Sequence, residues 1–130
     1  MYRAETRNIQ VTVTPSFMAE QSKPRSRQFF WAYTVEIINL GEETVQLHAR
    51  EWRITDGDGR LQQVNGLGVI GQQPVLPPGG RFEYTSGCPL TTPEGIMNGA
   101  YEMITDGGEH FKVEIPAFSL DSPHAHRTLN

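Results

Sequence analysis

Apolar and polar residues alternate along most of this chain, and no stretch shows the spacing of an amphipathic helix. Alternation places one side of an extended segment against a core and leaves the other in water, so the pattern predicts β-strands. Residues 29–38 are apolar on both sides, which is typical of a central strand. The apolar rows are Ile9–Val13, Phe29–Ile37, Val45–Ala49 continued by Trp52 and Ile54, Phe82–Tyr84, Met97–Met103 and Phe111–Ile115.

Short polar and glycine-containing segments separate these rows and predict turns. Asp56–Gly59 and Asp106–Glu109 are predicted hairpin tips, because glycine and aspartate tolerate the left-handed backbone of a tight turn. Asn39–Glu43 and Thr91–Gly95 predict two further turns. Seven or eight short strands joined in this way predict an all-β fold, an antiparallel two-sheet β-sandwich of the fibronectin type III or immunoglobulin kind.

The apolar phase changes within the third row. Val45 and Leu47 occupy odd positions, whereas the row continues on even positions at Trp52. A strand shifts phase by one residue at a β-bulge, so a bulge is predicted near Arg50 and Glu51.

The spacing Gly99-x-Tyr101-x-Met103 matches a feature of immunoglobulin-type strands, with methionine where a cysteine usually stands. It makes Tyr101 a candidate tyrosine corner, with a buried ring and a hydroxyl bonded to upstream backbone. Met103 is expected to fill the space between the sheets without a disulfide. Trp52 is the expected bulky filler between the sheets, and Trp31 is the competing candidate.

Length and charge narrow the function. The 130 residues are predicted to form a single domain, with 121–130 as a loose tail. A formal net charge of −4 argues against a nucleic-acid partner. The basic segment Lys23–Arg27 is predicted to be a solvated loop rather than a phosphate site.

The single cysteine, Cys88, excludes an intramolecular disulfide. The segment after Met1 lacks the apolar stretch of a signal peptide, and no apolar run approaches the ~20 residues of a membrane helix. A cytoplasmic protein without membrane insertion is therefore predicted.

A dinucleotide-binding fingerprint, Gly-x-Gly-x-x-Gly, occurs at Gly66–Gly71. That fingerprint needs a following helix, and Pro74, Pro77 and Pro78 exclude one. The segment is thus a predicted loop that shapes a connection, forms an anion nest, or presents a partner-binding surface with Val69, Ile70, Val75 and Leu76 as apolar contacts. The candidate ligand or partner residues are Gly66, Gly68, Val69, Ile70, Gly71, Gln73 and Pro74.

Other reactive residues give weaker signals. Ser86 lies outside a nucleophile elbow and is expected to be a structural serine at the end of a strand. Cys88 would be reactive only if exposed. His124 and His126 could chelate a metal from one side of an extended chain, but they lie in a tail beyond the last strand with no cysteine and only Asp121 nearby, and no metal site is predicted. The other histidines are His48 and His110. The Asp56 segment begins like a calcium loop, but the closing glutamate is missing. No catalytic residues and no cofactor are predicted.

The chain resembles the ApaG family, also called DUF525 or cobalt-resistance D. The matching segments are Trp52-Arg53-Ile54-Thr55-Asp56, Val64 to Gly79, Phe82 to Gly87 and Thr92 to Met103. The resemblance implies a fibronectin type III-like sandwich without an accepted enzymatic activity. It also implies an association with cobalt tolerance and magnesium efflux in bacteria, and related domains occur in eukaryotic F-box proteins and a DNA polymerase delta interacting protein.

Together these features predict a non-enzymatic module that binds an unidentified protein partner. The alternative is a binder of a small anion or nucleotide pyrophosphate through the Gly66–Gly71 loop. Whether the protein is a monomer or a homodimer is left open, because the sequence does not show which strand edges are exposed.

Overall fold

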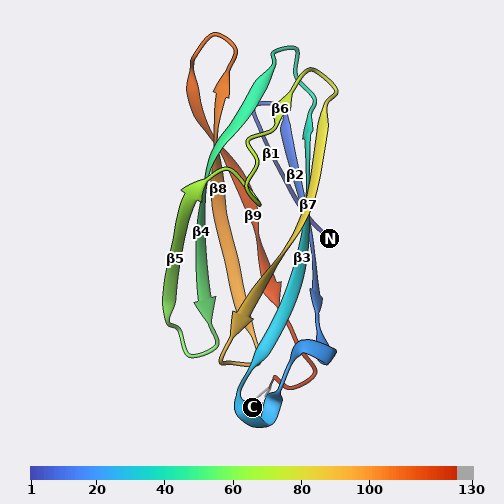
Figure 1. Ribbon diagram of the computed structural model, residues 1–130, viewed down its shortest axis with the longest axis vertical. Helices are drawn as coiled ribbons and strands as arrows, with labels where there is room; N and C mark the ends of the chain where they lie inside the picture. The colour runs from blue at the N-terminus through green and yellow to red at the C-terminus, as the bar shows by residue number, and fades with distance from the viewer. Residues whose placement is uncertain (126–130) are drawn as a thin grey trace.

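The structure, a computed structural model, describes residues 1–125, and in that part of the chain nine strands form two antiparallel sheets packed face to face (Figure 1). The described elements are β1 (Tyr2–Thr6), β2 (Ile9–Phe17), the 3₁₀ turns η1 (Ala19–Gln21) and η2 (Pro24–Ser26), β3 (Phe29–Asn39), β4 (Val45–Asp56), β5 (Leu61–Leu67), β6 (Val75–Leu76), β7 (Arg81–Leu90), β8 (Gly95–Thr105) and β9 (His110–Leu120).

The strand order is that of an immunoglobulin-like sandwich. One sheet runs β1-β2-β3-β7 and the other β5-β4-β8-β9, with the short β6 paired to β4. The chain changes sheets between β3 and β4, between β6 and β7, and between β7 and β8, as in the Greek-key connections of such folds. The predicted all-β sandwich is therefore confirmed.

The hairpin predicted at Asp56–Gly59 and the turn predicted at Asn39–Glu43 both form. Asp56 closes the β4–β5 hairpin, since its Oδ1 accepts hydrogen bonds from the amides of Asp58 and Arg60 at 2.9 and 3.0 Å. At the crossover after β3, the buried Asn39 amide donates to the carbonyls of Glu43 and Leu76 at 2.8 and 2.9 Å.

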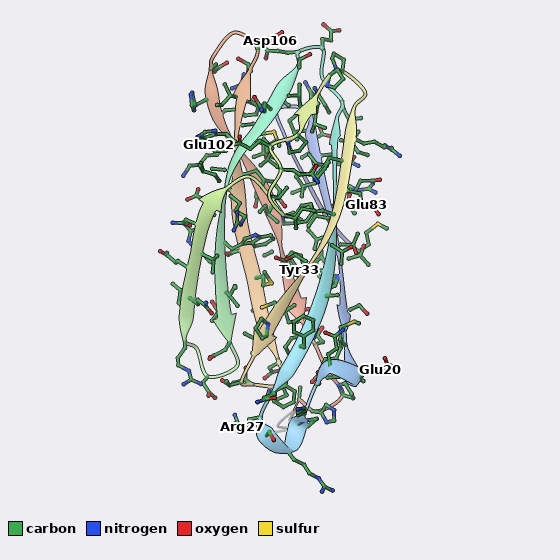
Figure 2. All side chains as sticks on the ribbon, viewed as in Figure 1. Glu20, Arg27, Tyr33, Glu83, Glu102 and Asp106 are labelled. Atoms are coloured by element: carbon green, nitrogen blue, oxygen red, sulfur yellow. The ribbon has the colours of Figure 1, made fainter. Side chains whose placement is uncertain are left out.

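The inward faces of both sheets supply the core, while the charged residues Glu83 and Glu102 lie at its periphery (Figure 2). Trp52 is the filler between the sheets, because its ring meets that of Tyr33 from the opposite sheet at 5.3 Å between centroids. Trp31 is equally buried but has a different role. Its indole Nε1 donates to the carbonyl of Asp121 at 2.8 Å.

Tyr101 is fully buried, but it is not a tyrosine corner. It lies in the middle of β8, and its hydroxyl is hydrogen-bonded to the hydroxyl of Tyr84 on β7, in the other sheet. The predicted bond to upstream backbone is wrong, because the ring points across the sandwich and not toward the connection that enters its strand. Met103 is fully buried two residues further on and pairs with Leu47 of β4.

The predicted bulge exists but lies two residues earlier than expected. The β4–β8 register shifts between Leu47 and Ala49, so His48 is the extra residue. The shift in apolar phase only brackets a bulge between Leu47 and Trp52, and the polar residues between them carry no apolar marker. The consequence is that Arg50 shares the inward face with Trp52.

Side-chain hydrogen bonds tie the two sheets together along the side formed by β1 and β9. The Tyr2 hydroxyl is bonded to the Ser119 hydroxyl at 2.8 Å, and the amide of Glu114 donates to Thr6 Oγ1 at 3.1 Å. The sequence pattern did not predict β1. Its turn uses Arg7 and Asn8 at φ 48° and 66° in place of glycine.

Residues 121–125 are anchored, so the prediction of a loose tail beginning at residue 121 is wrong for them. Besides the bond to Trp31, Ser122 Oγ donates to the carbonyl of Pro93 at 2.6 Å, and the His124 ring packs against Phe17 and Phe29. Polar composition suggested a free end, but the indole and the two rings hold it. No helix in residues 1–125 is long and apolar enough to cross a membrane.

Candidate functional site

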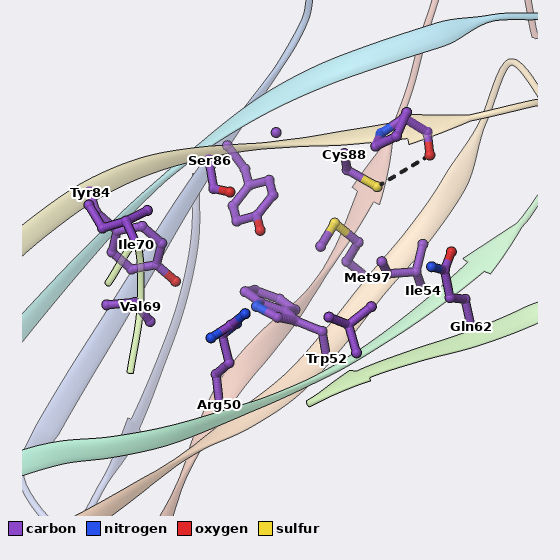
Figure 3. A pocket seen from close by; sticks show the side chains of 14 residues that line it. Arg50, Trp52, Ile54, Gln62, Val69, Ile70, Tyr84, Ser86, Cys88 and Met97 are labelled. Carbon is purple, nitrogen blue, oxygen red and sulfur yellow. Dashed lines mark hydrogen bonds between the residues drawn. The ribbon is translucent and has the colours of Figure 1, made fainter. Parts of the chain in front are cut away.

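A cleft of about 340 Å³ lies between the two sheets, on the side where β5 and β7 are the edge strands (Figure 3). Buried side chains form much of its wall, and each of them is less than a tenth exposed: Tyr33, Trp52, Val69, Tyr84, Cys88 and Met97. Gln62 and Val64 line it from β5, and Ser86 from β7. In the first sheet β7 is the edge opposite β1, and in the second sheet β5 is the edge opposite β9, so the cleft lies on the side of the sandwich away from β1 and β9.

Arg50 contributes the only formal charge among the cleft's lining residues. The bulge at His48 turns the Arg50 side chain inward, and Arg50 Nη1 donates to the carbonyls of Leu67 and Gly68 at 3.1 and 2.9 Å. The guanidinium lies across Gly66, where a Cβ would come within 2.8 Å of Nη1. Glycine at position 66 is thus explained by the packing of Arg50 and not by a nucleotide.

No ion pair within residues 1–125 includes Arg50. Its two carbonyl partners are neutral, so a half-buried positive charge remains uncompensated at this point of the sandwich. Three tyrosine hydroxyls lie within range of that charge. Burial raises the pKa values of Tyr33, Tyr84 and Tyr101, and the nearby Arg50 charge opposes that rise to a smaller extent.

The proton of the Tyr84–Tyr101 hydrogen bond can be assigned. Tyr101 is fully buried and its hydroxyl has Tyr84 as its partner, so Tyr101 must donate or leave a buried O–H unpaired. Burial is the main cause that raises the pKa of Tyr101, and the charge of Tyr84 and the hydrogen bond to it raise that pKa further. The hydroxyl proton of Tyr84 is then free to point into the cleft.

The loop after β5 is a tight turn. The amide of Val69 donates to the carbonyl of Gln72, and the amide of Gln72 donates back to Val69, both at 2.8 Å. The middle of the turn is left-handed, with Ile70 at φ 43° and Gly71 at φ 78°. Such a φ is strained for a β-branched residue.

The fingerprint glycines do not form a phosphate cradle of the dinucleotide type. Gly66 belongs to β5, and the amide of Gly68 donates to the carbonyl of His48 at 2.8 Å. The carbonyls of Leu67 and Gly68 face a cation, which is the reverse of an anion nest. Pro74, Pro77 and Pro78 lie in the segment between Gly71 and β7, where the described chain forms only the short strand β6.

The other loop candidates divide into structural and exposed residues. Gln73 Nε2 donates to the carbonyl of His48 at 2.9 Å, and the carbonyl of Pro74 accepts from the amide of Leu47 at 3.0 Å. Val69 and Leu76 are buried, so the expectation that they offer exposed apolar contacts is wrong. Val69 lines the cleft, and Leu76 joins the core from β6, opposite Val45 of β4.

Three large apolar side chains of this region are exposed instead. Leu67, Ile70 and Val75 have 69%, 54% and 57% of their surfaces in solvent. We call these three residues the apolar rim.

Ser86 and Cys88 do not form a nucleophilic centre with the described histidines. Ser86 lies within β7 and not at its end, opposite Tyr33 in the register. Cys88 is 2% exposed, and burial raises the pKa of its thiol to about 11. A neutral buried thiol is unreactive, so the condition of exposure on which a reactive Cys88 depended is not met.

The histidines are dispersed. His48 and His110 both lie beside the Glu102 carboxylate, at 3.8 and 3.4 Å, on the outer face of the second sheet. His124 packs among phenylalanines, and His126 lies outside the described residues. Among residues 1–125 no group of three or more His, Cys, Asp or Glu side chains could hold a metal ion. At the predicted calcium-loop segment, Arg60 Nε donates to Asp56 Oδ2 at 3.0 Å.

Sequence reasoning missed Arg50 as a site residue. The signal that could have found it was the even-numbered row Arg50, Trp52, Ile54, in which a charged residue continues an inward-facing apolar series. Placing the bulge at Arg50 itself hid that signal.

The strand order and the cleft between two edge strands define a class of protein, the fibronectin type III-like β-sandwiches. The comparison with known families is more specific. The ApaG domain matches residues 19–105, and the chain belongs to the ApaG family.

Relatives match along the whole chain. It is 63% identical to Protein ApaG of Xanthobacter autotrophicus and 61% identical to Protein ApaG of Azorhizobium caulinodans, in each case over 130 residues and all of both chains. A crystal structure of a putative ApaA protein from Bordetella pertussis superposes with a TM-score of 0.87 at 47% identity, covering 96% of this chain and 100% of that one.

Proposed function

We propose that this protein is a non-enzymatic binding module, located in the cytoplasm, that recognises a partner protein through the apolar rim. The observation that supports the proposal is the exposure of Leu67, Ile70 and Val75 on a loop that is rigidly held. Exposed apolar side chains grouped on one ordered segment are typical of a partner surface.

The rim is held in place by the residues that the sequence singled out. Gln73 and Pro74 bond the loop to β4, and the buried Val69 anchors the turn from below. A preorganised loop loses little conformational entropy on association. The strained φ of Ile70 supports the same conclusion, because the turn keeps a bulky apolar residue exposed where glycine or asparagine would cost less.

The proposal connects to the ion-related associations that resemblance to the family suggests. We place any role in cobalt tolerance or magnesium efflux in the partner complex. The observation behind this choice is that the apolar rim offers hydrocarbon surface and not oxygen, nitrogen or sulfur ligands.

The test compares two variants that each replace two exposed apolar side chains with polar ones. The rim variant combines Ile70→Asn with Val75→Thr, and the control combines Leu61→Thr with Ile96→Thr, since Leu61 and Ile96 are also more than half exposed. Asparagine tolerates the left-handed φ at position 70, so the rim variant should fold.

The measurement is affinity capture from a lysate of the source organism, with quantitative mass spectrometry. Proteins retained by the parent and by the control variant should be lost with the rim variant. Capture of the same proteins at the same levels by all three would exclude the apolar rim as the partner surface.

A further inference from the structure

The cleft between β5 and β7 has a chemical character that differs from that of the apolar rim, although Ile70 of the rim is also one of its lining residues. Its floor is aromatic and aliphatic, with Trp52, Tyr33 and Met97 all buried. A volume of about 340 Å³ is at the lower end of the range of small-molecule pockets. Pockets of this kind combine an apolar lining with a few polar groups that fix the orientation of the ligand.

The polar groups of this cleft are mainly hydrogen-bond donors. The Arg50 guanidinium has five N–H groups, and the two bonds to the Leu67 and Gly68 carbonyls both come from Nη1, so Nη2 and Nε are left for another partner. The Tyr84 hydroxyl has its oxygen occupied by the bond from Tyr101 and its own proton free. Figure 3 shows the Arg50 guanidinium and the Tyr84 hydroxyl directed toward one another across the cavity.

Such a donor set selects the charge and shape of an occupant. A half-buried guanidinium without a carboxylate partner favours an anion, and its planar fork matches the two oxygens of a carboxylate. The hydroxyl of Tyr84 adds a third donor from the opposite sheet, and the tyrosines stay neutral because burial raises their pKa values. The aromatic floor favours an apolar body on the same molecule.

The geometry points to a binding site for a carboxylate carried on a small apolar body, with Arg50 and Tyr84 holding the carboxylate and Trp52 packing against the body. Val69 and Ile70 of the Gly66–Gly71 segment line this cleft, but Arg50 and Tyr84 hold the carboxylate in place of the fingerprint amides, and the carbonyls of Leu67 and Gly68 help to position Arg50. The carboxylate belongs either to a free organic acid or to the C-terminal residue of a peptide, and the two sources share the same recognition chemistry.

The probes are phenylacetate, its neutral analogue phenylacetamide, and N-acetylphenylalanine as a mimic of a peptide C-terminus. Binding is followed by tryptophan fluorescence, to which Trp31 and Trp52 both contribute, and by amide chemical shifts at Arg50, Gly66 and Tyr84. Each probe is added up to about 10 mM, where a site with a Kd of about 1 mM is mostly filled. Phenylacetate should shift these signals saturably, and phenylacetamide should bind at least about tenfold more weakly. Tighter binding of N-acetylphenylalanine than of phenylacetate assigns the carboxylate to a peptide end, and the reverse order assigns it to a free acid.

Variants test the two donors separately. Arg50→Gln should weaken phenylacetate binding at least about tenfold, while Arg53→Gln, an exposed arginine on the same strand, should leave it unchanged. The double variant Tyr84→Phe with Tyr101→Phe removes the Tyr84 donor without leaving a buried hydroxyl unpaired, and should weaken binding severalfold.

Three results would overturn the site: equal binding of phenylacetate and phenylacetamide, unchanged binding by a folded Arg50→Gln variant, or no saturable shift in the wild-type protein. Should Arg50→Gln fail to fold because the loop carbonyls lose their partner, the comparison of acid with amide and the double tyrosine variant still decide the question.

Discussion

The hydrogen bond between Tyr84 and Tyr101 predicts an unequal response to two similar substitutions. If Tyr101 donates to Tyr84, then Tyr84→Phe leaves the Tyr101 O–H without an acceptor in a fully buried position. An unpaired buried donor costs about 1 to 3 kcal/mol. Tyr101→Phe removes only the bond itself, because the Tyr84 hydroxyl still reaches the cleft, and should cost about 0.5 to 1.5 kcal/mol.

The double variant separates this argument from simple loss of packing. With both hydroxyls removed, no polar group is left unpaired, so the cost should be well below the sum of the two single costs. Urea unfolding of the four proteins gives the coupling energy directly, with the slope of each transition checked for equality. Additive costs, or a larger cost for Tyr101→Phe than for Tyr84→Phe, would refute the assigned direction of the bond.

Three further predictions concern pH, strand geometry and nucleotides. Burial raises the pKa values of Tyr84 and Tyr101 above 10.0, so at alkaline pH the unfolded chain binds fewer protons than the folded one. The free energy of unfolding measured in urea should therefore fall as the pH rises above about 10, and it should fall less steeply in the double phenylalanine variant. Gly99→Ala should lower the free energy of unfolding by roughly 3 kcal/mol or more in a thermal unfolding measurement, since its Cβ would lie 2.1 Å from the Glu51 carbonyl oxygen. The control Gly107→Ala, whose Cβ meets nothing closer than 3.7 Å, should change it by no more than about 0.5 kcal/mol. Calorimetry with ATP or GTP at up to millimolar concentrations should show no saturable heat, because the amide of Gly68 already donates to a carbonyl; one-to-one binding would contradict this.

The sequence predicted the fold well because alternation and turn chemistry are local signals. The row from Phe29 to Ile37 and the hairpin at Asp56 both depend on neighbouring residues, and both formed as predicted. The strand β1 was missed because its apolar content is low and its turn lacks glycine. It is stabilised by pairing with β2, which is a contact between strands and not a property of the segment.

The candidate site was harder to predict, because its residues come from five strands and a loop. The Gly66 fingerprint marked the correct region for the wrong chemical reason, since Gly66 makes room for a guanidinium. Arg50 joined the cleft only because one extra residue, His48, rotated the strand. Tyr84 gained a free proton only through its contact with Tyr101. None of these relations can be computed from spacing along one segment.

Within residues 1–125 the β1–β9 side of the sandwich carries more of the hydrogen bonds between the sheets than the β5–β7 side, and this has a mechanical consequence. Tyr2 and Ser119 link the sheets on the β1–β9 side, whereas no disulfide joins them, because the single cysteine is free. Thermal opening should therefore begin with separation of the two sheets on the β5–β7 side, while the β1–β9 side stays closed. On that side the two sheets are joined by packing and by the bond between Tyr84 and Tyr101. A molecule bound by Arg50 from one sheet and by Tyr84 from the other would add a further link between the sheets, and its binding would slow the opening.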